Sequence, residues 1–135
     1  MRILSRLLLA VSLIQFAPTA AQTQTTAPPS VKKEFDGFIA KFRAALKAND
    51  AAAVSGMALL PFQGDASVSN AVQFREKIYR PNFTKQNRAC IRRETADYER
   101  DGENRENFFI FCDELIFTFT KTSSGFLLTD ISVND

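Results

Sequence analysis

Two cysteines, Cys90 and Cys112, have the clearest chemistry in this sequence. The chain has no histidine, so a cysteine–histidine nucleophile pair is excluded. In an oxidising compartment an even pair of cysteines is expected to form a disulfide. We therefore predict a Cys90–Cys112 bridge, whose loop would stabilise the fold by about 3 kcal/mol. Two buried free thiols are the alternative.

Carboxylates beside apolar strand segments are the next candidates, namely Asp113, Glu114 and Asp130. An apolar pocket that raised their pKa would permit acid–base chemistry together with Tyr79 or Tyr98. We favour the simpler interpretation, in which Asp113 and Glu114 form a turn and Asp130 lies on a solvated face. The residue types and spacings indicate no metal site, no phosphate loop and no cofactor.

Charge is unevenly distributed along the chain. Residues 75–93 hold seven basic side chains and one acid, whereas residues 94–114 hold eight acids and two arginines. The basic stretch predicts an anion-binding patch for a lipid headgroup or an envelope polymer. Its members would be Arg80, Arg88, Arg92 and Arg93. The alternative, which we favour, is that two neighbouring strands pair by opposite charge.

The first 21 residues have the pattern of a secretory signal peptide. Two arginines precede an apolar run, residues 7–16, and small residues lead to a cleavage site after Ala21. The run is shorter than the ~20 residues needed to span a bilayer, so no stable membrane anchor is expected. The mature protein would be periplasmic or secreted. It would carry 15 Lys and Arg against 15 Asp and Glu, a balance that argues against nucleic acid as a partner.

Residues 22–30 lack apolar periodicity and contain two prolines, so they are predicted to be a disordered linker before a domain of residues 31–135. A helix is predicted from residue 31 to about residue 47, with Ser30 as its cap. Asp50 would cap a second helix over residues 51–58. A third helix is predicted over residues 69–79, capped by Ser69 or Asn70 and ended by Pro81.

The period then changes to that of strands. Strands are predicted over residues 89–95, 107–112, 115–120 and 126–133, with turns at residues 101–102, 113–114 and 122–125. Phe108, Ile110 and Cys112 would face one side of the sheet, and Phe109 and Phe111 the other. Helices followed by antiparallel strands predict an α+β fold in which the long helix lies across the sheet.

Two stretches resemble a known superfamily, the nuclear-transport-factor-2-like (NTF2-like) proteins, which include SnoaL-like and ketosteroid-isomerase-like members. The first stretch is FDGFIAKFRAALKANDAAAVSGMALLPF, residues 35–62, and the second is the closing hairpin FTFTKTSSGFLLTDISVND, residues 117–135. The resemblance implies a curved antiparallel sheet wrapped around the long helix as a cone, with an apolar pocket at its open end. Enzymes of the superfamily use an Asp/His or Asp/Tyr constellation that cannot be matched here, so no catalytic residue is carried over.

The aromatic residues would line that pocket, form a plain core, or form a core together with a homodimer interface through the sheet. The candidate pocket residues are Phe38, Phe42, Phe62, Tyr79, Phe109, Phe117 and Phe119. We predict a non-catalytic binding or accessory domain for a small apolar ligand or an envelope protein partner. The alternatives are a small isomerase-type or hydrolase-type enzyme using a carboxylate and a tyrosine, and a dimeric structural protein.

Overall fold

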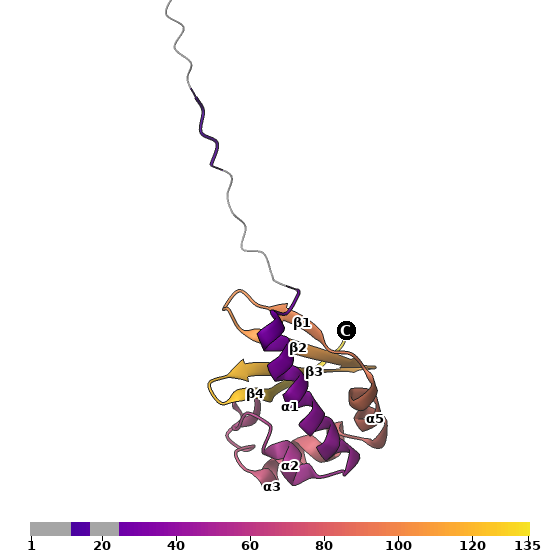
Figure 1. Cartoon of the computed structure of the whole chain (residues 1–135). Coiled ribbons are helices and arrows are strands. Elements are labelled where there is room, and N and C mark those ends of the chain that lie inside the picture. The colour runs from indigo at the N-terminus through magenta and orange to yellow at the C-terminus, as the bar shows by residue number, and fades with distance from the viewer. Residues whose placement is uncertain (1–11, 17–24) are drawn as a thin grey trace, which may run out of the picture.

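The computed structural model describes residues 12–16 and 25–135, and the elements of the domain are labelled in Figure 1. The predicted cleavage point after Ala21 lies outside the described residues, as do the first three residues of the predicted linker. The helices are α1 (Pro29–Lys47), α2 (Ala51–Ser55), η1 (Phe62–Gly64), α3 (Ala71–Phe74), η2 (Arg75–Tyr79), α4 (Arg80–Asn82) and α5 (Lys85–Arg93). The strands are β1 (Asp97–Arg100), β2 (Glu106–Cys112), β3 (Leu115–Thr122) and β4 (Gly125–Val133).

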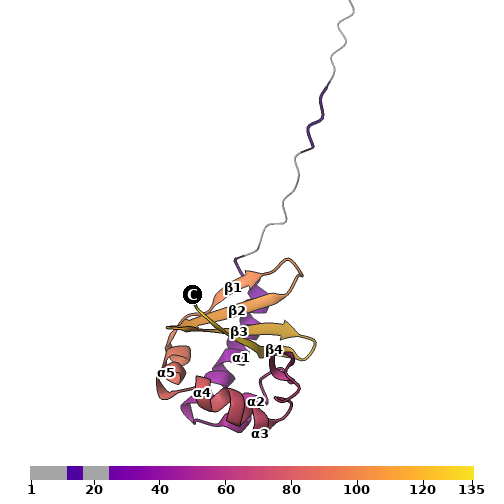
Figure 2. The same cartoon turned by 180° about the vertical axis from the view of Figure 1, so that it is seen from behind.

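The four strands form one antiparallel sheet in the order β1-β2-β3-β4. The long helix α1 runs across one face of this sheet, and in Figure 2 the strands lie in front of it. The register between β3 and β4 shifts at Thr118 and Phe119, which leaves Thr129 as an extra residue in β4. Such a bulge bends and twists a strand. The predicted α+β class, with a long helix, short helices and an antiparallel sheet, is confirmed.

The start of α1 differs from the prediction that Ser30 caps it. The helix begins at Pro29, and the capping residue is Pro28, which makes no side-chain cap hydrogen bond. Proline fits this first turn because its missing N–H would have no partner there and its φ angle is already helical. At the other end Asn49 takes a φ of 51°, and the Asp50 carboxylate accepts from the backbone N–H of Ala53, as predicted.

The strand predicted over residues 89–95 is wrong, because this segment forms most of α5. The hydroxyl of Thr84 caps that helix by accepting from the backbone N–H of Asn87, and Cys90 and Ile91 form its buried side. Pro81 also fails to end the third helical segment, which continues as α4 to Asn82. The proline directly follows the π-turn of η2, where the regular α-helical hydrogen-bond pattern is already interrupted, and the helix continues through it.

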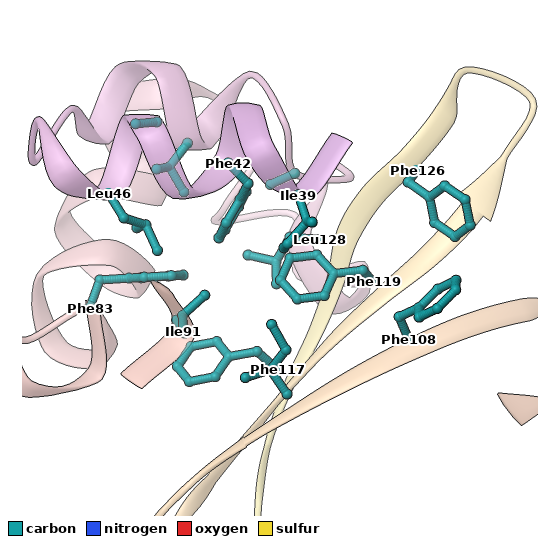
Figure 3. Close-up of a cluster of buried hydrophobic side chains, with 14 of the residues drawn as sticks. Ile39, Phe42, Leu46, Phe83, Ile91, Phe108, Phe117, Phe119, Phe126 and Leu128 are labelled. Atoms are coloured by element: carbon teal, nitrogen blue, oxygen red, sulfur yellow. The ribbon is translucent and has the colours of Figure 1, made fainter. Parts of the chain in front are cut away.

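The core lies between α1 and the inner face of the sheet (Figure 3). Phe42 and Leu46 point from α1 toward Phe117 and Phe119 of β3, while Ile91 approaches from α5. The predicted inward set of β2, namely Phe108, Ile110 and Cys112, is buried. The side chains of this cluster pack against one another and are almost fully buried.

Cys90 of α5 is joined to Cys112 at the end of β2, with their Sγ atoms 2.06 Å apart. This is the predicted pairing, and it is compatible with an extracellular location because disulfides persist in oxidising compartments. Among the residues that the structure describes, no helix has the length and apolar character required to cross a membrane.

Candidate ligand groove and neighbouring sites

The seven candidate pocket residues do not surround one common space. Five of them belong to the closed core, namely Phe42, Phe62, Tyr79, Phe117 and Phe119. Phe109 points from β2 to the outer face of the sheet, where it borders a different depression. Phe38 alone of the seven borders an open apolar groove on the flank of α1.

This groove runs between α1, the end of α2 and the β3–β4 hairpin, and its volume is about 720 Å³. Its apolar surface is provided by Phe38, Met57, Phe126 and Leu127. The residues of α1 that line it recur every three or four positions, which places them on a single side of the helix. They are Ser30, Lys33, Glu34, Gly37, Phe38 and Lys41.

Three of the five glycines in the sequence line the groove: Gly37, Gly56 and Gly125. Gly125 has a φ of 92° in the β3–β4 turn, a conformation that favours glycine. Gly37 lies in the middle of α1, where glycine costs roughly 1 kcal/mol relative to alanine. A Cβ added at Gly37 would meet nothing within 4 Å. Packing therefore does not demand a glycine at this position, and its effect is to leave the groove wider.

Charge at the edge of the groove is predominantly positive. Glu34 is the one carboxylate in the lining, and it forms an ion pair with Lys121 at 2.9 Å. Within the described part of the chain, no ion pair or hydrogen bond engages the ammonium groups of Lys33 and Lys41. An apolar floor between two unpaired cations suits a ligand with a hydrocarbon body and an anionic head.

The structure brings together only two of the four arginines of the predicted anion patch. Arg80 and Arg88 line a cleft beside Tyr79, whereas Arg93 forms an ion pair with Glu94 and Arg92 is exposed on α5. The favoured alternative, opposite charges pairing between neighbouring strands, is wrong because residues 85–93 are helical. Strand β1 pairs with β2, within the acidic stretch, where Arg100 faces Glu106.

The candidate carboxylates take structural positions. Asp113 and Glu114 form the turn between β2 and β3, as predicted, and Asp113 has a φ of 51°. Asp130 lies half-buried on the outer face of the sheet and accepts a hydrogen bond from the side-chain amide of Gln63. None of the three lines the groove.

A different carboxylate, Glu106, accepts a hydrogen bond from the hydroxyl of Tyr98 across the β1–β2 ladder. Sequence reasoning named Tyr98 but not its partner. A two-residue turn at Asp101 and Gly102 would pair Tyr98 with Arg105. The observed loop of residues 101–105 pairs Arg100 with Glu106 and so places Glu106 diagonally opposite Tyr98. The pair lies away from the groove, whose lining includes neither residue.

Burial, reinforced by the Glu106 carboxylate, raises the pKa of Tyr98 from 10.0 to about 12. The folded protein therefore holds this proton more tightly than the unfolded chain does. The resulting stabilisation is complete below pH 10 and is lost as the pH rises through about 12. We expect Tyr98→Phe to reduce the fall in unfolding free energy across this interval, measured by urea unfolding at successive pH values. Parallel curves for the two proteins would contradict this assignment.

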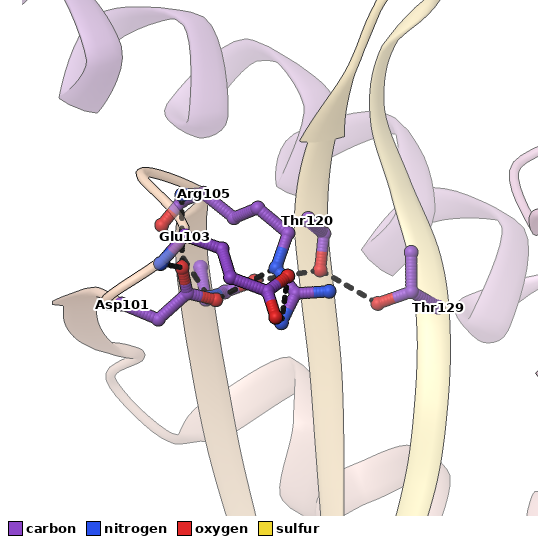
Figure 4. A network of polar contacts seen from close by, with 6 residues as sticks. Asp101, Glu103, Arg105, Thr120 and Thr129 are labelled. Carbon is purple, nitrogen blue, oxygen red and sulfur yellow. Dashed lines mark hydrogen bonds and ion pairs between the residues drawn. The ribbon is translucent and has the colours of Figure 1, made fainter.

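A second polar network fixes the β1–β2 turn to the outer face of the sheet (Figure 4). The backbone N–H of Arg105, aided by the side chains of Arg105 and Asn107, lowers the pKa of Asp101 to about 2. Asn107 also accepts from Thr120, whose hydroxyl lies 2.7 Å from that of Thr129. These groups satisfy one another, so we assign the network to the stability of the hairpin.

The outer face of the sheet mixes apolar and polar side chains. Phe111 is 44% exposed and lies opposite Ile116 in the ladder, while Thr118 and Thr120 occupy neighbouring positions of β3. The homodimer through this face remains a prediction.

In comparisons with known proteins, no family model, no curated protein and no solved structure matches this chain.

Proposed function

We propose that the chain is an exported, non-catalytic binding domain that holds a small amphipathic anion in the groove beside α1. The ligand class is a carboxylate with an unbranched hydrocarbon chain. The observation that carries the proposal is the apolar floor of Phe38, Met57, Phe126 and Leu127, lying between two lysines without partners among the described residues. Cleavage after Ala21 and a periplasmic or secreted location belong to the same proposal.

The geometry suits such a ligand in length as well as in chemistry. Lys33 and Lys41 are eight residues apart on α1, which corresponds to about 12 Å along the helix axis. A hydrocarbon chain lying along this distance would cover the apolar floor, and each Å² of apolar surface removed from water would contribute about 25 cal/mol. The carboxylate would then lie within reach of one lysine, because the flexible lysine side chain allows its ammonium group to move to the carboxylate.

We infer that the domain is a compact member of the NTF2-like cone architecture. Two features support this inference: the long helix that lies against an antiparallel sheet, and the bulge at Thr129 that curves β4. In this arrangement the centre of the cone is occupied by Phe42, Phe117 and Phe119, each 0% exposed. The ligand is therefore placed on the flank of the helix and not inside the cone.

The groove can be blocked without removing any side chain that holds the fold. We expect Gly37→Leu to weaken the binding of dodecanoate at least tenfold, because the new side chain occupies the open space above the floor. Isothermal titration calorimetry of residues 22–135, prepared in an oxidising host, measures this change.

Gly37→Ala is the matched control, since it adds one methyl group at the same position. We expect it to raise the free energy of unfolding by about 1 kcal/mol, through helix propensity, and to retain most of the binding. Equal dodecanoate affinities for Gly37→Leu and the wild type would contradict the assignment of the groove as the binding site.

A further inference from the structure

A second concave site lies near the C-terminal end of α1, whereas the groove begins at the N-terminal end of this helix. It is a cleft of about 330 Å³ that involves Asn49, Tyr79, Phe83 and three arginines. The arginines are Arg75, Arg80 and Arg88. None of these residues lines the groove, so the cleft is independent of the proposed function.

The unusual helix η2 explains how two of the arginines reach one cleft. Arg75 and Arg80 are five residues apart, which in an α-helix would turn them about 140° away from each other. The segment Arg75–Tyr79 is instead a π-helix, in which the backbone N–H of Arg80 bonds to the carbonyl of Arg75. Because this wider turn takes up the extra residue, Arg75 and Arg80 come to the same side of the helix. Single π-turns of this kind occur frequently at functional sites.

Carboxylates hold these side chains without cancelling their charge. Glu76 forms ion pairs with Arg75 at 3.4 Å and with Arg80 at 2.7 Å. The Asp50 carboxylate also lies near the cleft, but it is engaged in capping α2. With three guanidinium groups against two carboxylates, the cleft retains a positive charge.

The third arginine and the tyrosine form a rigid wall. Arg88 uses its Nη1 to donate to the carbonyl of Phe83 at 2.7 Å, which leaves further N–H groups of its guanidinium for a ligand. Tyr79 is 6% exposed, its hydroxyl donates to Asn49 Oδ1 at 2.7 Å, and its ring stacks on Phe83. Burial, the largest influence, raises the pKa of this phenol, so the wall adds no negative charge at neutral pH.

We propose that this cleft binds a phosphate group through Arg75, Arg80 and Arg88. Guanidinium groups present paired N–H donors that match the oxygens of a phosphate, and several of them around one concavity favour a doubly charged anion over a chloride ion. The group is either a free phosphate or the headgroup of an anionic phospholipid. Both sources present the same oxygens to the cleft.

The sequence contains a matched pair of variants for testing the cleft. Arg75→Gln removes a cleft guanidinium that is exposed and that, among the described residues, pairs only with its neighbour Glu76. Arg92→Gln removes the same charge from an exposed position of α5 that does not line the cleft. We expect Arg75→Gln to weaken the binding of inorganic phosphate at least tenfold and Arg92→Gln to change it less than twofold, measured by NMR titration of residues 22–135. Arg88→Gln should weaken binding similarly, with thermal unfolding as its check because Arg88 also contacts Phe83.

A vesicle experiment separates the two sources of the phosphate group. Co-sedimentation with phosphatidylglycerol vesicles that depends on Arg75 identifies a lipid headgroup, and phosphate binding without vesicle binding identifies a free phosphate. Absence of saturable binding in both experiments, or equal losses for Arg75→Gln and Arg92→Gln, would overturn the proposal. Gly37→Leu should leave phosphate binding unchanged, so failure of the groove and failure of the cleft are distinguishable.

Discussion

Replacing Phe119 by alanine should lower the free energy of unfolding by about 4 kcal/mol, a large part of the 5–15 kcal/mol typical of a small domain. The side chain is 0% exposed and lies where α1 meets the sheet. Its ring centroid is 5.0 Å from that of Phe42 and 5.7 Å from that of Phe38, both in edge-on arrangements. The variant loses the apolar transfer energy of the ring and leaves a cavity that its neighbours cannot fill. Urea unfolding at neutral pH measures the change.

The matched control is Phe111→Ala in the adjacent strand. This variant removes the same ring from the outer face of the sheet, where Phe111 is 44% exposed. It should lower the free energy of unfolding by less than about 1 kcal/mol. Comparing the losses in free energy of unfolding of the two variants tests which face of the sheet packs against the core. Similar losses for both would mean that the outer face is covered in solution, as the predicted homodimer requires, or that the two faces are wrongly assigned.

The β2–β3 and β3–β4 hairpins were predictable because two local signals agree in them. In β3 the aromatic residues occupy every second position, and the turns on either side contain residues suited to them, such as Asp113 and Gly125. The bulge at Thr129 was not predicted, although it changes the phase of alternation in β4. Leu128 lies opposite Phe119, whereas Ile131, three positions later, lies opposite Phe117. Its position depends on how β4 pairs with β3 across the whole hairpin.

The misassigned helix α5 shows the limit of periodicity in a charged segment. Only Cys90 and Ile91 are buried there, and two apolar positions cannot distinguish a helix from a strand. Tertiary contacts settle the matter: Arg43 of α1 donates to the backbone carbonyls of Ile91 and Glu94 and so satisfies the C-terminal end of the helix. No local sequence signal reports a contact between residues about fifty positions apart.

The seven candidate pocket residues do not surround one space, for a related reason. Alternating phenylalanines indicate a buried face, but they cannot show whether the space beside that face is empty or filled. Here the core aromatic residues fill it, and the groove is formed by residues such as Gly37 and Met57 that carry no chemical signal of their own. The sequence shows the arginines as one basic stretch, but a spacing of five residues on an ideal α-helix would place Arg75 and Arg80 on different sides. The π-turn that unites them became visible only in the fold.

Both proposed sites lie at the periphery of the domain, beside α1. Because the centre of the domain is closed by aromatic packing, recognition is left to the periphery, where α1 meets other elements along its flank and near its C-terminal end. One site combines an apolar floor with lysines, and the other combines arginines with a tyrosine wall. Because the two sites share no lining residue, Gly37→Leu and Arg75→Gln test them separately.

The Cys90–Cys112 disulfide should contribute more to stability than any single hydrogen bond or ion pair of the domain. It closes a loop with a sequence separation of 22 between α5 and the end of β2. In the chain-entropy description, a loop of this length restricts the unfolded chain enough to stabilise the fold by about 3 kcal/mol. We therefore expect the double variant Cys90→Ala and Cys112→Ala to unfold at a markedly lower urea concentration than the oxidised wild type.

Reduction provides the matched control for this prediction. Alanine removes the thiols from two buried positions without adding a polar group, so the double variant and the wild type kept in dithiothreitol should have nearly the same unfolding midpoint. The double variant itself should not respond to dithiothreitol. Ile91 and the hydrogen bonds from Arg43 still hold α5 against α1, so the variant should remain folded in the absence of urea. An oxidised wild type with the same midpoint as the variant would show that the bridge does not stabilise the domain, and the case for a fold adapted to an oxidising compartment would weaken with it.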